Sequence, residues 1–229
     1  MTPLVFLPGM MCDARLWGPQ VAAMSHLTLH FPTLSGQDSM AALAAQVLAQ
    51  APPRFALAGL SMGGIVAMEV IRQAPDRVAR LALLDTNPRA ESPQMQVRRG
   101  PQIDRVRRGG LTEVMRDEMK PNYLSDGRHK REILDLCMEM AVSLGPEAFI
   151  SQSVALRDRP DQQQTLKAVT VPTLILCGRD DALCPVERHQ LMHGLIPGST
   201  LHIVDGAGHL PTLEQPQHTT TALLRWMEE

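Results

Sequence analysis

Short β-rich runs alternate along this chain with longer segments of helical periodicity, and this alternation constrains the fold more than any other feature. Strand–helix alternation is typical of a parallel sheet with helices packed against it. Several of the β-rich runs are apolar throughout, as expected for strands covered on both faces. The predicted strands are 3–7, 27–31, 54–59, 79–84, 172–177 and 200–204, with helical patterns near 14–24, 38–50, 62–74, 186–195 and 212–228. We therefore predict an α/β fold whose mostly parallel sheet of about six strands is flanked by helices.

The segment 87–165 breaks this alternation because it contains no convincing strand. Its helical stretches lie near 92–108, 111–119, 128–143 and 146–157. We predict a core domain made of 1–86 and 166–229, and an all-helical cap, or lid, made of 87–165. Such a cap would cover the carboxyl ends of the strands, where open α/β sheets bind their ligands. The alternative is a small helical domain with no role at the site.

Charge and cysteine content exclude several classes of protein. The formal net charge is −2, which gives no electrostatic footprint for nucleic acid or for an anionic membrane surface. The four cysteines form no CxxC pair, and no histidine cluster completes a zinc site. No signal peptide and no apolar run of membrane-spanning length is evident. We expect a cytoplasmic monomer or homodimer with reduced thiols, no metal and no organic cofactor.

A candidate nucleophile lies in the sequence GLSMGG, between a predicted strand and a predicted helix. Gly59, Ser61 and Gly63 match G-x-S-x-G, and Gly64 follows. A sharp strand-to-helix turn would force the serine into a strained conformation, and small neighbours would let the backbone pass closely. The turn would present the Ser61 hydroxyl at the sheet edge, on the positive end of a helix. The alternative is a serine that only caps the helix.

A serine hydroxyl needs a base, and His209 is the predicted one among eight histidines. It lies in a glycine-rich loop, GAGHLP, directly after the last strand. An acid should orient the imidazole, and Asp181 is predicted from its place after the strand 172–177. Asp85, at the end of strand 79–84, and Asp180 remain alternatives for that acid.

Two backbone N–H groups would receive the negative charge that develops on a carbonyl oxygen during acyl transfer. One is predicted at Met62, the residue after the serine. The other is predicted at Met10, in the loop after the first strand. Met10, Met11 and Met62 are also expected to line the pocket, which gives Met11 as a substrate-binding residue.

These motifs, taken together and in this order, resemble the α/β-hydrolase superfamily in its small, cap-bearing, esterase-like branch. LVFLPGMMCDARLW resembles the first core strand and oxyanion loop, and GLSMGG resembles the nucleophile elbow. CGRDDALCP resembles the acid loop G-x-x-D-x-x-x-P, which maps the acid onto Asp181. GAGHLPTLEQP resembles the histidine loop, which maps the base onto His209. Two departures stand out: Pro8 replaces the usual histidine before Gly9, and the usual N-terminal hairpin has no room.

The resemblance implies ester hydrolysis through an acyl-enzyme. We predict a carboxylic ester hydrolase for small to medium acyl substrates. A lactonase, a thioesterase, a C–C bond hydrolase and a ligand receptor with a slow triad are the alternatives. The arginines of the cap are interpreted as a solvated helix face, with an anionic substrate or a phosphorylated carrier as the alternative. They are Arg98, Arg99, Arg105, Arg107 and Arg108.

Overall fold

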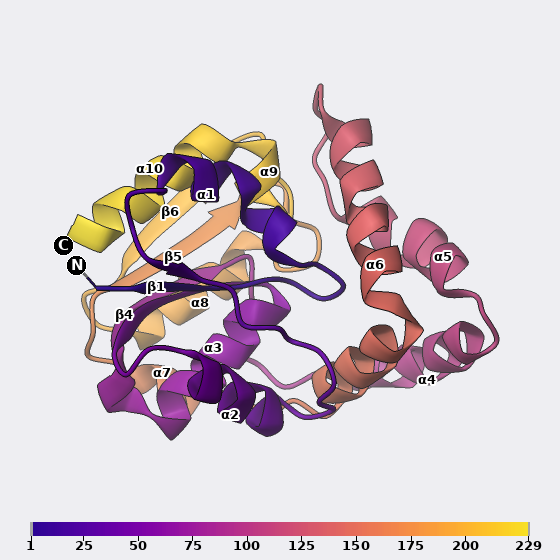
Figure 1. The fold of residues 1–229 in the computed structure, drawn as a ribbon, viewed down its shortest axis with the longest axis horizontal. Helices are drawn as coiled ribbons and strands as arrows, with labels where there is room; N and C mark the ends of the chain where they lie inside the picture. The colour runs from indigo at the N-terminus through magenta and orange to yellow at the C-terminus, as the bar shows by residue number, and fades with distance from the viewer. Residues whose placement is uncertain (1, 229) are drawn as a thin grey trace.

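Six strands form one sheet in the computed structural model, which describes residues 2–228 (Figure 1). Their order is β2-β1-β3-β4-β5-β6, and every neighbouring pair is parallel. The strands are β1 (Leu4–Leu7), β2 (Leu29–His30), β3 (Phe55–Leu60), β4 (Val78–Leu84), β5 (Thr173–Gly178) and β6 (Thr200–Val204). The predicted α/β fold with six strands is confirmed. The ends of the predicted core domain, residues 1 and 229, lie outside the described residues.

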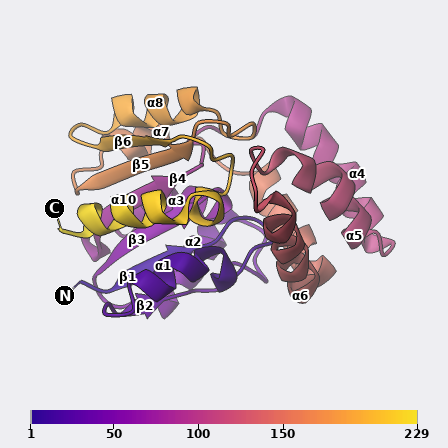
Figure 2. The same cartoon turned by 90° about the horizontal axis from the view of Figure 1, so that it is seen from above.

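Helices cover both faces of the sheet, which explains why β1, β3 and β5 are buried along their whole length (Figure 2). One face carries the turn η1 (Ala14–Trp17), α1 (Gly18–Ala23), α9 (Pro211–Glu214) and α10 (Pro216–Glu228). The other carries α2 (Met40–Gln50), α3 (Met62–Gln73), the turn η2 (Pro75–Arg77), α7 (Gln163–Lys167) and α8 (Val186–Leu195).

The side chains of β1 show how the core divides between these two faces. Phe6 packs in one cluster with Trp17 and Trp226, and its ring stacks on Trp17 with centroids 4.4 Å apart. Val5 and Leu7 alternate to the other face, in the cluster that contains α2 and α3. Since successive strand residues point to opposite faces, each face of β1 has its own apolar layer. This two-sided burial holds the carboxyl ends of the strands in fixed register.

The segment between β4 and α7 is helical, as predicted, and stands beyond the carboxyl ends of the strands (Figures 1 and 2). Its elements are α4 (Pro93–Arg107), α5 (Leu111–Val114), the turns η3 (Met115–Met119) and η4 (Lys120–Asn122), and α6 (Lys130–Arg157). The sequence predicts two helices over the range of α6, and α6 consists of two helices joined at a kink. Gly145 interrupts α6 with φ 79° and ψ 177°, and Pro146 restarts it. Proline is well suited to that position because the first residues of a helix need no N–H partner.

Two other elements differ from expectation in their length. β2 has only two residues, where five were predicted from 27–31. The predicted helix 212–228 is divided into α9 and α10 at Gln215, because Pro216 cannot continue the hydrogen bonding of α9.

Among residues 2–228, no helix combines the length and the apolar character needed to cross a membrane.

Candidate active site

Ser61 occupies a sharp turn between β3 and α3, and its backbone lies in the left-handed region with φ 55°. Such a conformation costs about 1–3 kcal/mol for a residue with a Cβ, so the surroundings must enforce it. The Ser61 N–H donates to the carbonyl of Leu84 at 2.9 Å. The Thr86 hydroxyl donates to the Ser61 carbonyl at 2.7 Å. The end of β4 therefore fixes the turn from both sides.

The glycines around Ser61 are required by close backbone contacts. A Cβ at Gly59 would lie 2.3 Å from the Gly63 carbonyl oxygen, and a Cβ at Gly63 would lie 2.2 Å from the Leu7 carbonyl oxygen. A Cβ at Gly64 would lie 2.7 Å from the side chain of Thr86. A side chain at any of these positions would displace backbone or a packed residue. The spacing of GLSMGG is thus explained by sterics at this turn.

The structure brings together the three side chains predicted as a triad. His209 Nε2 lies 2.8 Å from Ser61 Oγ, and His209 Nδ1 lies 2.8 Å from Asp181 Oδ2. His209 and Asp181 are both buried, while Ser61 is half-buried. A proton can therefore pass from the hydroxyl to an imidazole whose far side is held by a carboxylate.

Asp181 is fixed by more than its histidine partner. Its Oδ1 accepts the backbone N–H groups of Leu183 at 2.8 Å and Cys184 at 3.0 Å. Burial on its own would raise the pKa of this carboxyl, but the charge of His209 and the hydrogen bonds from His209, Cys184 and Leu183 lower the pKa below its usual value. The site thus holds Asp181 as a carboxylate, the form that accepts from an imidazole N–H.

Neither alternative acid contacts the imidazole. Asp180 is exposed, and its backbone N–H donates to the Ala207 carbonyl. Asp85 is fully buried, and its Oδ1 accepts the Gly178 N–H at 2.8 Å. Burial first, and the negative charge of Asp181 second, raise the pKa of Asp85 well above its usual value. A neutral Asp85 beside a charged Asp181 fits this pair, because two adjacent carboxylates would repel each other.

Two residues that the sequence interpretation missed hold the loop that carries His209. The Glu214 carboxylate accepts the N–H groups of Gly208 at 2.9 Å and Leu210 at 3.0 Å. The Tyr123 carbonyl accepts the His209 N–H at 2.7 Å. Glu214 lies in the motif GAGHLPTLEQP, so its spacing from the histidine was a usable signal. Tyr123 lies in the helical segment, and no pattern in the sequence connects it to the loop.

The loop after β1 lies against the serine turn. A Cβ at Gly9 would lie 3.5 Å from Ser61 Cβ. The backbone N–H groups of Met10 and Met62 donate to no residue in the range 2–228. Both remain free for an oxygen placed above Ser61, as expected for the predicted oxyanion donors.

Gln152 on α6 supports this loop from the helical segment. Its Oε1 accepts the Met11 N–H at 2.9 Å, and its Nε2 donates to the Leu34 carbonyl at 2.7 Å. The side chain is buried, so both bonds are shielded from water. Met11 has a positive φ of 56°, a conformation that this hydrogen bond helps to hold. Gln152 thus supplies support where Pro8 replaces the usual histidine.

A cavity of about 850 Å³ opens above Ser61 and His209. The core contributes Met10 to its lining, and the helical segment contributes Arg99, Met119 and Leu156. The helical segment therefore contributes to the lining of the cavity. Two residues expected in the pocket lie elsewhere: Met11 and Met62 are buried in the core cluster and are not part of the lining. We therefore do not propose substrate contact for Met11.

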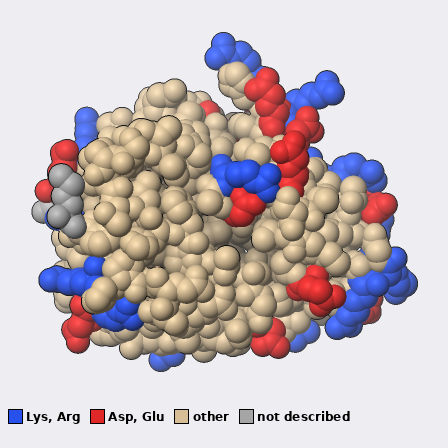
Figure 3. Space-filling model, in the orientation of Figure 1, with Lys and Arg blue, Asp and Glu red and all other residues tan. Residues whose placement is uncertain are grey.

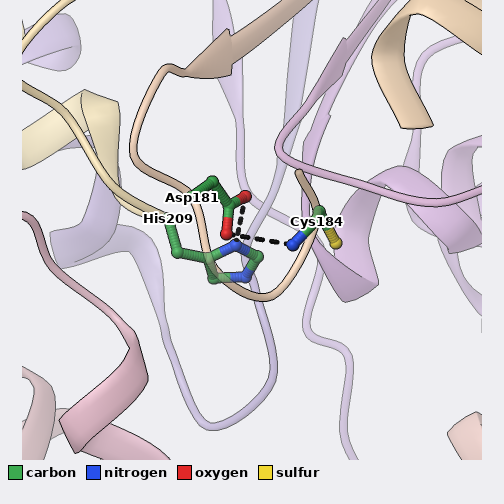
Figure 4. A group of neighbouring side chains, drawn as sticks. All are labelled: Asp181, Cys184 and His209. Carbon is green, nitrogen blue, oxygen red and sulfur yellow. Dashed lines mark hydrogen bonds and ion pairs between the residues drawn. The ribbon is translucent and has the colours of Figure 1, made fainter. Parts of the chain in front are cut away.

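Asp181, Cys184 and His209 offer donor atoms within 4.8 Å of one another, a spacing that could hold a metal ion (Figure 4). Their chemistry does not fit one. Burial raises the pKa of the Cys184 thiol well above its usual value, and a metal needs the thiolate. His209 Nδ1 faces Asp181, and Figure 4 shows that carboxylate shared between the imidazole and the Cys184 N–H. The group is better explained as an oriented histidine.

A six-stranded parallel sheet, a strand–serine–helix turn and a histidine hydrogen-bonded to that serine define the chain as an α/β hydrolase. Comparison with known sequences agrees, because the profile of the Alpha/beta hydrolase family matches residues 4–223. The chain belongs to this family.

Similar proteins include esterases. The chain is 32% identical over 240 residues to a pimeloyl-(acyl-carrier protein) methyl ester esterase of Klebsiella pneumoniae, covering 93% of this chain and 88% of that protein. Among solved structures, a thermophilic esterase from Thermogutta terrifontis is 31% identical with a TM-score of 0.93, covering 100% of this chain and 90% of that one. An enol-lactonase from Burkholderia xenovorans, 23% identical over 100% of this chain and 92% of that one, shares the fold with a TM-score of 0.88.

Asp85→Asn should change how stability depends on pH. In the unfolded chain Asp85 loses its proton near pH 3.9, roughly its usual pKa, whereas the folded protein retains that proton to higher pH. The free energy of unfolding of the wild type therefore falls as pH rises from the unfolded pKa of Asp85 toward its higher folded pKa. The fall is up to about 1.4 kcal/mol per pH unit. Asparagine carries no such proton. Urea unfolding at pH 5 to 8 should show that the free energy of unfolding of the variant increases relative to that of the wild type as pH rises. Parallel curves would contradict a neutral Asp85, and exposed Asp180→Asn is the control.

Gln152→Met should lower the rate of ester turnover more than it raises KM. The substitution keeps the side-chain length but leaves the Met11 N–H and the Leu34 carbonyl without their partner, so the loop with Met10 shifts. A displacement of about 1 Å at a catalytic donor costs up to roughly 100-fold in rate. Steady-state kinetics on a p-nitrophenyl ester measures the loss. Ser151→Ala, whose hydroxyl bonds only within α6, is the matched control. An unchanged kcat in folded Gln152→Met would refute this role.

Proposed function

We propose that this α/β hydrolase cleaves carboxylic esters of small to medium acyl groups through an acyl-enzyme. In this proposal Ser61 is the nucleophile, His209 the general base and acid, and Asp181 the residue that orients His209. The observation that carries the proposal is the continuous line of hydrogen bonds from Ser61 Oγ through His209 to Asp181, in which Ser61 and His209 line one cavity.

The first half-reaction forms the acyl-enzyme. His209 Nε2 takes the proton of Ser61 as Oγ attacks the ester carbonyl carbon, and the carbonyl π electrons move to oxygen. The N–H groups of Met10 and Met62 stabilise that oxyanion, each being worth roughly 3–4 kcal/mol of barrier. When the tetrahedral intermediate collapses, the C–O bond to the alcohol breaks and His209 returns its proton to the leaving oxygen.

The second half-reaction uses the same groups on water. His209 takes a proton from water as the water oxygen attacks the acyl carbon, and the bond from that carbon to Ser61 Oγ breaks. The proton returns to Ser61, and the carboxylic acid leaves. Asp181 stays ionised throughout, because its lowered pKa favours the charge that stabilises the imidazolium.

Two features support esters as the substrate class. Two similar proteins, 32% and 31% identical to this chain, are named as esterases. The cavity is of the size that holds a small molecule. The same groups could also open lactones, thioesters or activated C–C bonds, and a ligand receptor could retain them with slow chemistry. Repeated turnover separates an enzyme from such a receptor, and a panel of esters, thioesters and lactones ranks the substrate classes.

We also propose that 87–165 acts as a cap over the cavity. Its support is that α4, α6 and the turn at Tyr123 contribute lining residues and loop contacts to the core. In this proposal the cap sets which acyl group fits, while the core supplies the chemistry.

Ser61→Ala should abolish turnover of p-nitrophenyl acetate, and Asp181→Asn should lower kcat by roughly 10⁴-fold because the imidazole is left in the wrong tautomer. Asp180→Asn, the neighbouring exposed carboxyl, is the matched control and should keep wild-type rates. Release of p-nitrophenol under multiple-turnover conditions provides the measurement, with circular dichroism to show that each variant is folded. Wild-type activity in Ser61→Ala would remove that residue from the mechanism, and a loss confined to Asp85→Asn would move the acid there.

A further inference from the structure

Two arginines of the cavity wall share one buried carboxylate. Arg99 on α4 donates to Glu91 Oε2 through Nε at 3.1 Å and Nη2 at 2.7 Å. Arg159, which follows α6, lies 3.0 Å from Glu91 Oε1. The side chains of Arg99 and Arg159 are each 9% exposed, and that of Glu91 is 6% exposed. We call these three residues the arginine pair with its bridge.

This group carries one positive charge more than its carboxylate neutralises. An uncompensated charge in a buried position is costly, because little water reaches it. Beyond this group the cavity wall carries three arginines and two acidic residues, so it does not supply the missing anion. These arginines, Arg89, Arg98 and Arg188, form no ion pair within residues 2–228. Figure 3 shows that charged side chains on this face lie mainly over the helical segment and around the rim of the molecule.

The remaining edge of Arg99 faces the side chain of Met10, in the loop after β1. Glu91 occupies Nε and Nη2, whereas Nη1 contacts only the sulfur of Met10, at 3.9 Å. Met10 follows Gly9, which lies against Ser61. The guanidinium therefore lies on the side of the cavity formed by the loop after β1. It contacts Met10 of this loop, and the neighbouring Gly9 lies against the serine turn. A guanidinium edge of this kind is a strong donor to a carboxylate.

The solvated-face interpretation holds for Arg105 and Arg107 of α4 but not for Arg99. Arg105 and Arg107 are exposed and pair with acidic side chains at the surface. Arg99 is turned inward and held by Glu91 on one side only. Glu91 fixes both arginines in place but neutralises only one of their two charges, which is the arrangement expected of a prepared anion site.

We propose that the arginine pair with its bridge binds a carboxylate on the substrate, so that the preferred substrates are half-esters of dicarboxylic acids. The proposal rests on the proposed ester hydrolysis at Ser61 and names the substrate class for it. The ester carbonyl would lie over Ser61 with its oxygen toward Met10, and the free carboxylate would lie at Arg99 Nη1.

Kinetics with matched ester pairs tests the preference. Monomethyl esters of succinate, glutarate and adipate carry the carboxylate, and the dimethyl esters of the same acids do not. For the wild type we expect kcat/KM to be at least about 10-fold higher for the best half-ester than for its dimethyl ester. In Arg99→Gln that ratio should fall about 10-fold or more, while the Glu91–Arg159 pair remains to keep the wall folded. Arg159→Gln gives a second test should Arg99→Gln not fold.

Arg107→Gln is the matched control, since it removes the same charge from the exposed face of α4 and should leave the ratio unchanged. A wild-type ratio near one, with both esters hydrolysed, would overturn the carboxylate site and leave ester hydrolysis standing. An equal fall of the ratio in Arg107→Gln would assign the effect to overall charge and would also overturn the site.

Binding without turnover separates the two proposals. Calorimetric titration of Ser61→Ala with the monomethyl esters should show binding that is lost in the Ser61→Ala, Arg99→Gln double variant. If the wild type hydrolyses none of these esters but Ser61→Ala binds half-esters through Arg99, the carboxylate site stands and the proposed ester hydrolysis fails. Equal binding of half-esters and dimethyl esters to Ser61→Ala would overturn the carboxylate site.

Discussion

The hydrogen bond between His209 Nε2 and Ser61 Oγ joins two loops that are 148 residues apart in the chain. Neither loop could hold this geometry alone. Ser61 is held in a left-handed conformation by the end of β4, and the histidine loop is tied down by Glu214 and by the Tyr123 carbonyl. Ser61 follows β3 and the histidine loop follows β6, so the parallel sheet presents both loops at the same edge in constant register. The proposed chemistry depends on that constancy.

The helical segment contributes to the site in two physically different ways. Gln152 reaches from α6 into the core and makes two buried hydrogen bonds, one with the Met11 N–H in the loop after β1 and one with the Leu34 carbonyl after β2. Arg99 reaches from α4 and brings positive charge to the cavity wall. The first contact positions the loop that carries the Met10 N–H. The second favours, in our proposal, a substrate that carries a carboxylate. A single insertion can thus influence both the reaction and its selectivity without carrying a member of the proposed triad.

Sequence patterns predicted the fold well because apolar strand runs and glycine spacing are local signals. They also singled out Ser61, His209 and Asp181, which the structure places in mutual contact. Two kinds of feature were not predicted from the sequence. Gln152 and Tyr123 act on loops far away in the chain, and an isolated glutamine or a carbonyl leaves no pattern. Met11 was expected in the pocket, but its positive φ and its bond to Gln152 place it in the core instead.

The central claim is that His209 makes Ser61 a nucleophile, and covalent labelling tests it most directly. Treatment of the folded protein with a fluorophosphonate, followed by intact mass measurement and peptide mapping, should show one phosphonyl adduct, located on Ser61. His209→Ala should remain folded and acquire almost none. An unlabelled Ser61, an adduct at another residue, or equal labelling without the imidazole would contradict the account.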